Sequence, residues 1–173
     1  MKTRIALLAA TALLVCVAAA GPKPAPAVDS QAGFDRLKSL AGNWEAVSDK
    51  GKSRLSYELI ASGSVVLERE NSDEFPQGGS MVTAYHLDSK RLVLTHYCMA
   101  GNQPRMEARS FDAATGEIRF EFAGATNLAT PGAGHMHNAK LRFVDDNHLV
   151  SEWTFFENGK PKFTESLQYT RVR

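Results

Sequence analysis

From Gly42 to the C-terminus, hydrophobic and polar positions alternate with a period of two, in short runs separated by turn residues. In one run Ile118, Phe120 and Phe122 alternate with Arg119 and Glu121. This period, with many β-branched and aromatic residues, is typical of strands that bury one face. The pattern predicts about ten strands. Their expected ranges are 42–49, 52–61, 64–71, 79–87, 90–98, 103–111, 116–124, 134–144, 147–157 and 160–171.

The same alternation assigns side chains to faces. One apolar face holds alternate residues of a single run, namely His135, His137, Ala139, Leu141 and Phe143. A second is formed by Leu55, Tyr57 and Leu59. The strand glutamates are expected on the polar faces, and they are Glu68, Glu70, Glu107, Glu121 and Glu152. An apolar face opposite a polar one indicates antiparallel sheet with water on one side only.

Residues 29–41 give the one helical signal. Asp29 or Ser30 is a suitable N-cap residue for this helix. Its apolar positions recur at helical spacing, and they are Phe34, Leu37 and Leu40. No second helical layer is available to cover the strands. We therefore predict an all-β, up-and-down antiparallel barrel with a short N-terminal helix, and a two-sheet sandwich is the alternative.

The connections differ between the two ends of such a barrel. One end receives tight turns at residues 62–63, 88–89, 112–115 and 145–147. The other end receives residues 49–51, 71–78, 99–102, 125–134 and 158–159, of which three connections are longer. We therefore expect one closed end and one mouth.

The N-terminus predicts export. Lys2 and Arg4 precede an apolar run from Ile5 to Val17, and small residues follow it. This is the layout of a secretory signal peptide at 1–20, with cleavage after residue 20 or 27, a Pro/Ala linker at 21–29 and one barrel domain at 30–173. The protein is then periplasmic or secreted. The run is shorter than the roughly 20 residues that span a membrane.

One of the two cysteines in the sequence, Cys16, lies within this leader. A lipid anchor on Cys16 is an alternative to cleavage, although Val15 is larger than the residue usually found before a lipidated cysteine. The mature chain then keeps one cysteine, Cys98, without a partner for a disulfide.

Charge excludes one class of partner. Removing the leader at residue 20 lowers Lys+Arg from 20 to 18 against 19 Asp+Glu, so the mature net charge is near −1. This is no basic footprint for nucleic acid. The motifs of common enzymes (Gly-x-Ser-x-Gly, the P-loop, the dinucleotide glycines and His-Glu-x-x-His) are absent from the sequence, which favours a protein that is not an enzyme.

The stretch GNWEA at residues 42–46 resembles the Gly-x-Trp opening of the calycins, the barrel superfamily of lipocalins and fatty-acid-binding proteins. The resemblance implies a ligand cavity, and a basic residue near the chain end, Arg171 or Arg173, packed across Trp44. The strand number is similar to that of fatty-acid-binding proteins and of nitrobindin-like haem barrels. The nitrobindin-like glycines are replaced by Ala46 and Ser48, and the sequence has no histidine after residue 148.

Two pairs of His and Cys residues are the candidates for binding a metal or another ligand. His96 and Cys98 end the fifth predicted strand, and His135 and His137 begin the eighth, so both pairs fall at the mouth. Each pair has i, i+2 spacing and shares a face. Three imidazoles and a thiolate form a ligand set suited to zinc or copper, and one histidine suffices for haem. The strands lie ~14 Å apart along the wall at ~4.8 Å per strand, so only reach across the lumen would unite them.

The roles of two further residues, Tyr97 and Arg105, depend on which strand face points inward. His96 and Cys98 share a face with two leucines, but the opposite face, which ends in Tyr97, is nearly as apolar. If that face is inward, Tyr97 lines the cavity. Arg105 is expected on the outer wall, and it becomes a contact for an acidic ligand only if the register is reversed.

We therefore expect an exported barrel that binds a small hydrophobic or amphipathic molecule through its mouth, without a cofactor. The alternative is a zinc, copper or haem barrel, with or without enzymatic activity, built on the His/Cys residues. The third hypothesis is a structural barrel whose lumen is filled by large inward side chains. The sequence makes no prediction about oligomeric state.

Overall fold

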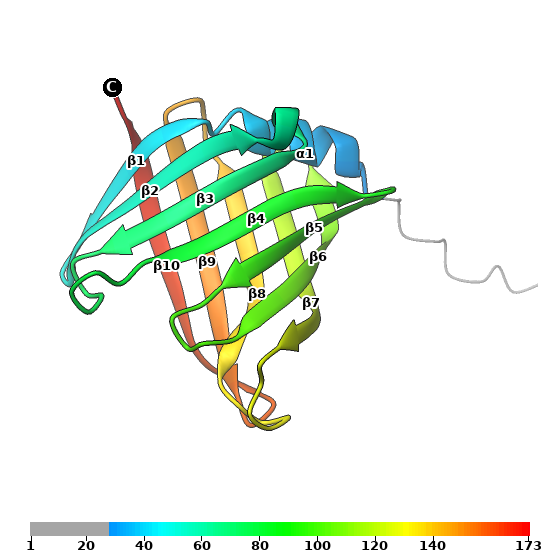
Figure 1. The fold of residues 1–173 in the computed structure, drawn as a ribbon. Helices are drawn as coiled ribbons and strands as arrows, with labels where there is room; N and C mark the ends of the chain where they lie inside the picture. Colours follow the sequence, from blue (N-terminus) through cyan, green and yellow to red (C-terminus); the bar gives the residue numbers. More distant parts are fainter. Residues whose placement is uncertain (1–27) are drawn as a thin grey trace, which may run out of the picture.

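The computed structural model describes residues 28–173. The expected signal peptide, its cleavage sites, Cys16 and most of the linker lie outside this range. The described residues form one antiparallel β-barrel of ten strands preceded by a short helix (Figure 1). Each strand pairs with the next along the chain, and the last strand closes the barrel on the first. The predicted up-and-down barrel is confirmed, and the sandwich is not formed.

The ten observed strands begin and end within two residues of their predicted bounds. In chain order they are β1 (Gly42–Ser48), β2 (Gly51–Ile60), β3 (Val65–Ser72), β4 (Met81–Asp88), β5 (Arg91–Tyr97), β6 (Gln103–Asp112), β7 (Glu117–Thr126), β8 (His135–Phe143), β9 (His148–Glu157) and β10 (Lys160–Val172). A single 3-10 turn, η1 (Ala61–Gly63), joins β2 to β3.

The helix α1 (Ser30–Lys38) covers one end of the barrel, the end that also receives the tight turns (Figure 1). The side chain of Asp29 accepts a hydrogen bond from the backbone N–H of Ala32, 3.0 Å away, and so caps the helix as one of the two expected residues. The apolar helix face is buried against β4, β5 and β6. Gly33 permits this approach, since a Cβ there would lie 3.2 Å from Leu92 Cδ2.

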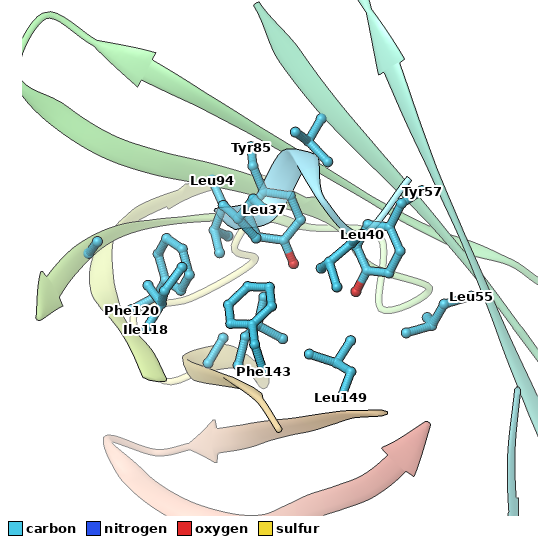
Figure 2. Close-up of a cluster of buried hydrophobic side chains, with 14 of the residues drawn as sticks. Leu37, Leu40, Leu55, Tyr57, Tyr85, Leu94, Ile118, Phe120, Phe143 and Leu149 are labelled. Carbon is cyan, nitrogen blue, oxygen red and sulfur yellow. The ribbon is translucent and has the colours of Figure 1, made fainter. Parts of the chain in front are cut away.

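The lumen next to α1 is filled with apolar side chains. Phe120, Phe143, Leu94 and Leu149 converge there from different strands beneath Leu37 of the helix (Figure 2). All five are buried. This half of the barrel is the hydrophobic core, and burial at about 25 cal/mol per Å² of apolar surface is its main source of stability.

Arg171 connects the helix, the first strand and the last strand. Its guanidinium carbon lies 4.2 Å from the centre of the Trp44 ring. The same group donates to the backbone carbonyl oxygens of Ser39 (2.8 Å), Ala41 (2.7 Å) and Asp146 (2.9 Å). Trp44 in turn donates from Nε1 to the carbonyl of Leu40, at 2.8 Å. The expected pairing of a C-terminal arginine with Trp44 is confirmed for Arg171.

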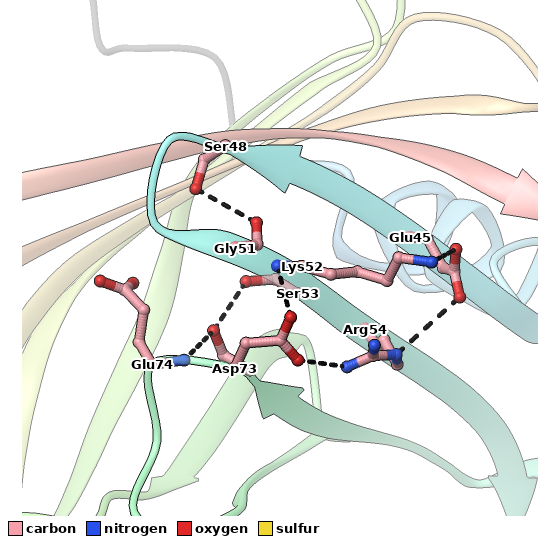
Figure 3. A network of polar contacts seen from close by, with 9 residues as sticks. Glu45, Ser48, Gly51, Lys52, Ser53, Arg54, Asp73 and Glu74 are labelled. Atoms are coloured by element: carbon pink, nitrogen blue, oxygen red, sulfur yellow. Dashed lines mark hydrogen bonds and ion pairs between the residues drawn. The ribbon is translucent and has the colours of Figure 1, made fainter.

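The opposite end carries the longer connections, as predicted. Polar contacts hold the β3–β4 loop to β2 there (Figure 3). Asp73 accepts hydrogen bonds from the backbone N–H of Lys52 and from Nη1 of Arg54, each at 3.0 Å. Gly51 permits this contact, because a Cβ at Gly51 would lie 2.9 Å from the Cβ of Asp73. The mouth therefore has a fixed rim on the β1–β3 side.

Candidate functional site

A row of polar side chains crosses four neighbouring strands and points into the lumen. Tyr57 of β2 pairs with Glu68 of β3, Glu68 with Thr83 of β4, and Thr83 with His96 of β5. No member of the row is more than 3% exposed. The register forces them onto one face, because side chains directly opposite each other on paired strands point the same way. The row borders the apolar core, to which Tyr57 also contributes.

The row is only partly hydrogen-bonded. Tyr85 donates its hydroxyl to a Glu68 carboxylate oxygen at 2.9 Å, and Thr83 Oγ1 lies 2.9 Å from His96 Nδ1. The Tyr57 hydroxyl and His96 Nε2 have no hydrogen-bond partner among the described residues. Figure 2 shows the Tyr57 hydroxyl pointing into the lumen beside that of Tyr85. Because more than about nine-tenths of buried polar groups are satisfied in folded proteins, two such atoms in one row single it out.

The opposite wall of the lumen completes the site. The His96 ring lies 4.9 Å from the Trp153 ring of β9, centre to centre, and Trp153 Nε1 donates to Ser151 Oγ at 3.1 Å. Between the walls is a small cavity in which about 10 Å³ is available to the centre of a water molecule. Its lining residues are Leu55, Glu68, Glu70, Ser151, Trp153, Glu165, Leu167 and Tyr169.

Burial shifts the protonation of these groups. Desolvation raises the pKa of Glu70 to about 8, and the negative charges of Glu68 and Glu165 add to this rise. Desolvation also raises the pKa of Glu68, although the neighbouring hydroxyls of Tyr57, Tyr85 and Thr83 act in the opposite direction. Burial lowers the pKa of His96 to about 4, so its imidazole is neutral at pH 7. The lumen thus holds protonatable carboxyls beside a neutral histidine.

Sequence reasoning placed Glu68 and Glu70 on the outer face, and this was wrong. Both line the cavity, and so does Glu165, which the sequence did not single out. A signal was present in the predicted turn at residues 62–63. A hairpin centred there pairs Tyr57 with Glu68 and Leu55 with Glu70, which puts both glutamates on the apolar face of β2.

His96 and Cys98 lie where the leucine face predicts. His96 points inward with Leu92 and Leu94. Cys98 follows the end of β5 and is partly buried. Burial raises the pKa of the Cys98 thiol, and the charge of Glu70 adds to the rise. A thiol shifted in this direction is a poor nucleophile and a poor metal ligand at neutral pH.

His135 and His137 occupy a β-bulge that the sequence did not predict. The register of β8 against β9 shifts between Met136 and Asn138, so the strict alternation expected from His135 onward breaks. His135 Nε2 lies 3.1 Å from His137 Nδ1. The His137 ring stacks between two phenylalanine rings, with centroid distances of 4.6 Å to Phe122 and 4.0 Å to Phe156.

The four His/Cys residues are not brought together as one ligand set. His96 contacts Thr83 and Trp153, whereas His135 and His137 pack against phenylalanine rings. Within residues 28–173, no group of three or more His, Cys, Asp or Glu side chains is placed to hold a metal ion. The described side chains therefore do not form the four-residue zinc or copper site of the alternative hypothesis.

Tyr97 and Arg105 lie on the outer wall, away from the lumen. Tyr97 is 51% exposed, and Arg105 pairs with Thr95 on the same outer face. Both line a groove of about 580 Å³ over β4 to β7, with Arg91 and Glu107 at its margin. The outer position expected for Arg105 is confirmed, and Tyr97 does not share a face with His96.

The described part of the chain contains no helix with the length and apolar character needed to span a membrane. No protein-family model and no curated protein matches the sequence. The closed ten-strand antiparallel barrel with its one short helix fits a calycin-like fold.

Proposed function

We propose that this barrel binds a small amphipathic molecule in the mouth half of its lumen, with entry through the open end. The observation that carries the proposal is the luminal row with two unpartnered buried polar atoms, Tyr57 Oη and His96 Nε2, next to a cavity. A barrel whose lumen is only structural filling gains nothing from such atoms, because each unmade hydrogen bond costs about 1–3 kcal/mol.

Aromatic side chains at the mouth supply the apolar part of the site. Phe155 of β9 and Phe163 of β10 are stacked with ring centres 5.1 Å apart, and Phe163 is 48% exposed. Trp153 lies two residues before Phe155 on the same strand. A ligand that enters from this end meets aromatic rings first and polar groups deeper. It goes no further, because the space beside α1 is already filled.

We also propose that the protein is exported, on the evidence of its leader-like N-terminus, and that it is a member of the calycins. The second proposal is supported by the barrel and by the stacking of Arg171 on Trp44, which follows the calycin pattern. The metal or haem alternative has weaker support, because the four His/Cys residues do not form one group.

The binding proposal is tested by the fluorescence of Trp153 in a Trp44→Phe background, with 2-phenylethanol as the probe. We expect a saturable change in emission. Ser151→Phe fills the cavity and should abolish it, whereas Val150→Phe adds the same ring to the outer face of β9 and should leave it unchanged. A linear, unsaturable response, or equal responses in the two variants, overturns the proposal.

A further inference from the structure

The cavity in the mouth half is lined by carboxylates without a cation inside the barrel. Three of its eight lining residues are Glu68, Glu70 and Glu165, and none of the eight is lysine or arginine. Within the described chain, Glu165 makes one ion pair, with Lys50 Nζ at 3.9 Å, and the Lys50 side chain is 56% exposed at the rim. Glu68 and Glu70 make no ion pair in that part of the chain. Glu68 is buried and Glu70 is half-buried, and removing a charged carboxylate from water is costly unless a positive charge joins it.

A second observation indicates that the cavity is built to receive a group. Tyr57 Oη and His96 Nε2 are unpartnered, and their residues are 3% and 2% exposed. Both belong to the inward row that contains Glu68. Tyr57 lies next to Glu68 across the β2–β3 pair, and His96 packs on Trp153, which lines the cavity. The polar atoms at the two ends of this row therefore lack partners, and Glu68 of the same row lines the cavity.

The size of the cavity restricts the group. About 10 Å³ is available to the centre of a water-sized sphere, which is close to the minimum that holds one water molecule. A primary ammonium group has about that size and carries three N–H donors. Three carboxylates surround the space. A quaternary ammonium group is too large for it, and a carboxylate or phosphate is repelled by the glutamates.

We propose that the ligand is a small primary amine whose ammonium group enters this cavity and pairs with Glu70, Glu68 and Glu165, while its apolar part lies against Trp153 and the mouth aromatics. This inference rests on the proposed luminal binding site and names the ligand class. The bound cation favours the ionised form of these carboxyls and pairs with it, so the ion pairs contribute to the binding free energy.

Isothermal titration calorimetry at pH 8.5 compares four probes with one aromatic tail: phenethylammonium, 2-phenylethanol, 3-phenylpropionate and trimethyl(2-phenylethyl)ammonium. We expect phenethylammonium to bind roughly tenfold or more tightly than the alcohol, as a charged hydrogen bond in a buried site requires. The carboxylate and the quaternary amine should bind more weakly than the alcohol. Glu70→Gln should remove the preference for the amine, and Glu58→Gln, which removes an exposed outer carboxylate of β2, should keep it.

The outcomes distinguish failure of the amine inference from failure of the proposed luminal binding site. If the alcohol and the amine bind equally, or if Glu70→Gln keeps the preference, the amine inference is overturned and the luminal site stands. Equal binding of the quaternary amine overturns the restriction to primary amines. If none of the four probes binds, the luminal site itself is overturned. Thermal melting of both variants shows whether each remains folded.

Discussion

Glu70 is a half-buried carboxyl that lines the cavity beside two others, Glu68 and Glu165. It has no ion pair within the described chain, and desolvation with the charges of Glu68 and Glu165 raises its pKa to about 8. The carboxyl is therefore largely protonated at neutral pH in the unliganded barrel, and a bound cation would favour its ionised form. Charge on this residue is then linked both to stability and to ligand binding.

The pH dependence of stability has a defined sign. The unfolded chain loses the Glu70 proton near pH 4.5, whereas the folded protein keeps it until about pH 8. The stability that the protonated Glu70 contributes is therefore fully present below pH 4.5, and it is lost as the pH rises through the folded pKa of about 8. The raised pKa of Glu68 acts in the same direction. The pKa of His96 is lowered, so its burial costs stability only when the pH is below the ordinary histidine pKa of 6.5. Between pH 6.5 and 9, a change in the free energy of unfolding therefore reflects ionisation of the buried carboxyls.

We expect the free energy of unfolding in urea to fall by on the order of 1–2 kcal/mol across this window in the unliganded protein. Glu70→Gln should flatten most of the fall, and the remainder belongs to Glu68. Glu58→Gln should keep the full fall. The charge of Glu70 also raises the pKa values of Tyr85, Cys98 and Tyr169. Tyr57 lies beside Glu68 and has a raised pKa, and Lys50 pairs with Glu165 at the rim. An unchanged slope in Glu70→Gln contradicts the assignment.

At the scale of elements, α1 and its connection to the barrel set the difference between the two ends. The helix closes one end, and the loop after it is held by Arg171, which reaches from β10 to the carbonyls of Ser39 and Ala41. Cations near the last carbonyls of a helix are favourable, and stacking on Trp44 adds a cation–π contact. The chain end and the chain start of the domain are thus joined across the β1–β10 seam.

Arg171→Ala should lower the free energy of unfolding by about 2–3 kcal/mol, because a cation–π contact and several hydrogen bonds are lost together. Arg173→Ala removes a neighbouring arginine that is exposed, and it should change the value by less than about 0.5 kcal/mol. Urea unfolding of both variants measures the difference. Equal effects of the two substitutions would show that the stacked geometry contributes nothing to stability.

The elements themselves follow from the sequence, and the local exceptions do not. Period-two alternation and turn residues predicted every strand because each strand buries one face only. The β8 bulge was not predictable, because one extra residue leaves no signal in a run that begins with two histidines and an asparagine among apolar residues. Cross-strand register was the missing step for Glu68 and Glu70, since a strand with polar residues at alternate positions looks the same whether these face water or a polar lumen.

At the scale of the whole molecule, one half of the barrel supplies stability and the other carries the proposed function. The half beside α1 is closely packed with aromatic and aliphatic side chains (Figure 2). The mouth half holds the polar row, the carboxylates and the exposed aromatic rings. A rigid wall with an unsatisfied interior at one end is the arrangement expected of a binding barrel. The sequence predicted the location of the mouth, but it did not identify the glutamates that line the cavity there.

The most direct test of the central claim, a small molecule held in the mouth half, is native mass spectrometry of the full chain, exported and purified without a His-tag or amine buffers. We predict an organic adduct of low mass on the wild type and on Val150→Phe, and its loss in Ser151→Phe. An adduct that persists in Ser151→Phe, or a bare polypeptide mass for the wild type even after incubation with phenethylammonium and 2-phenylethanol, would contradict the claim.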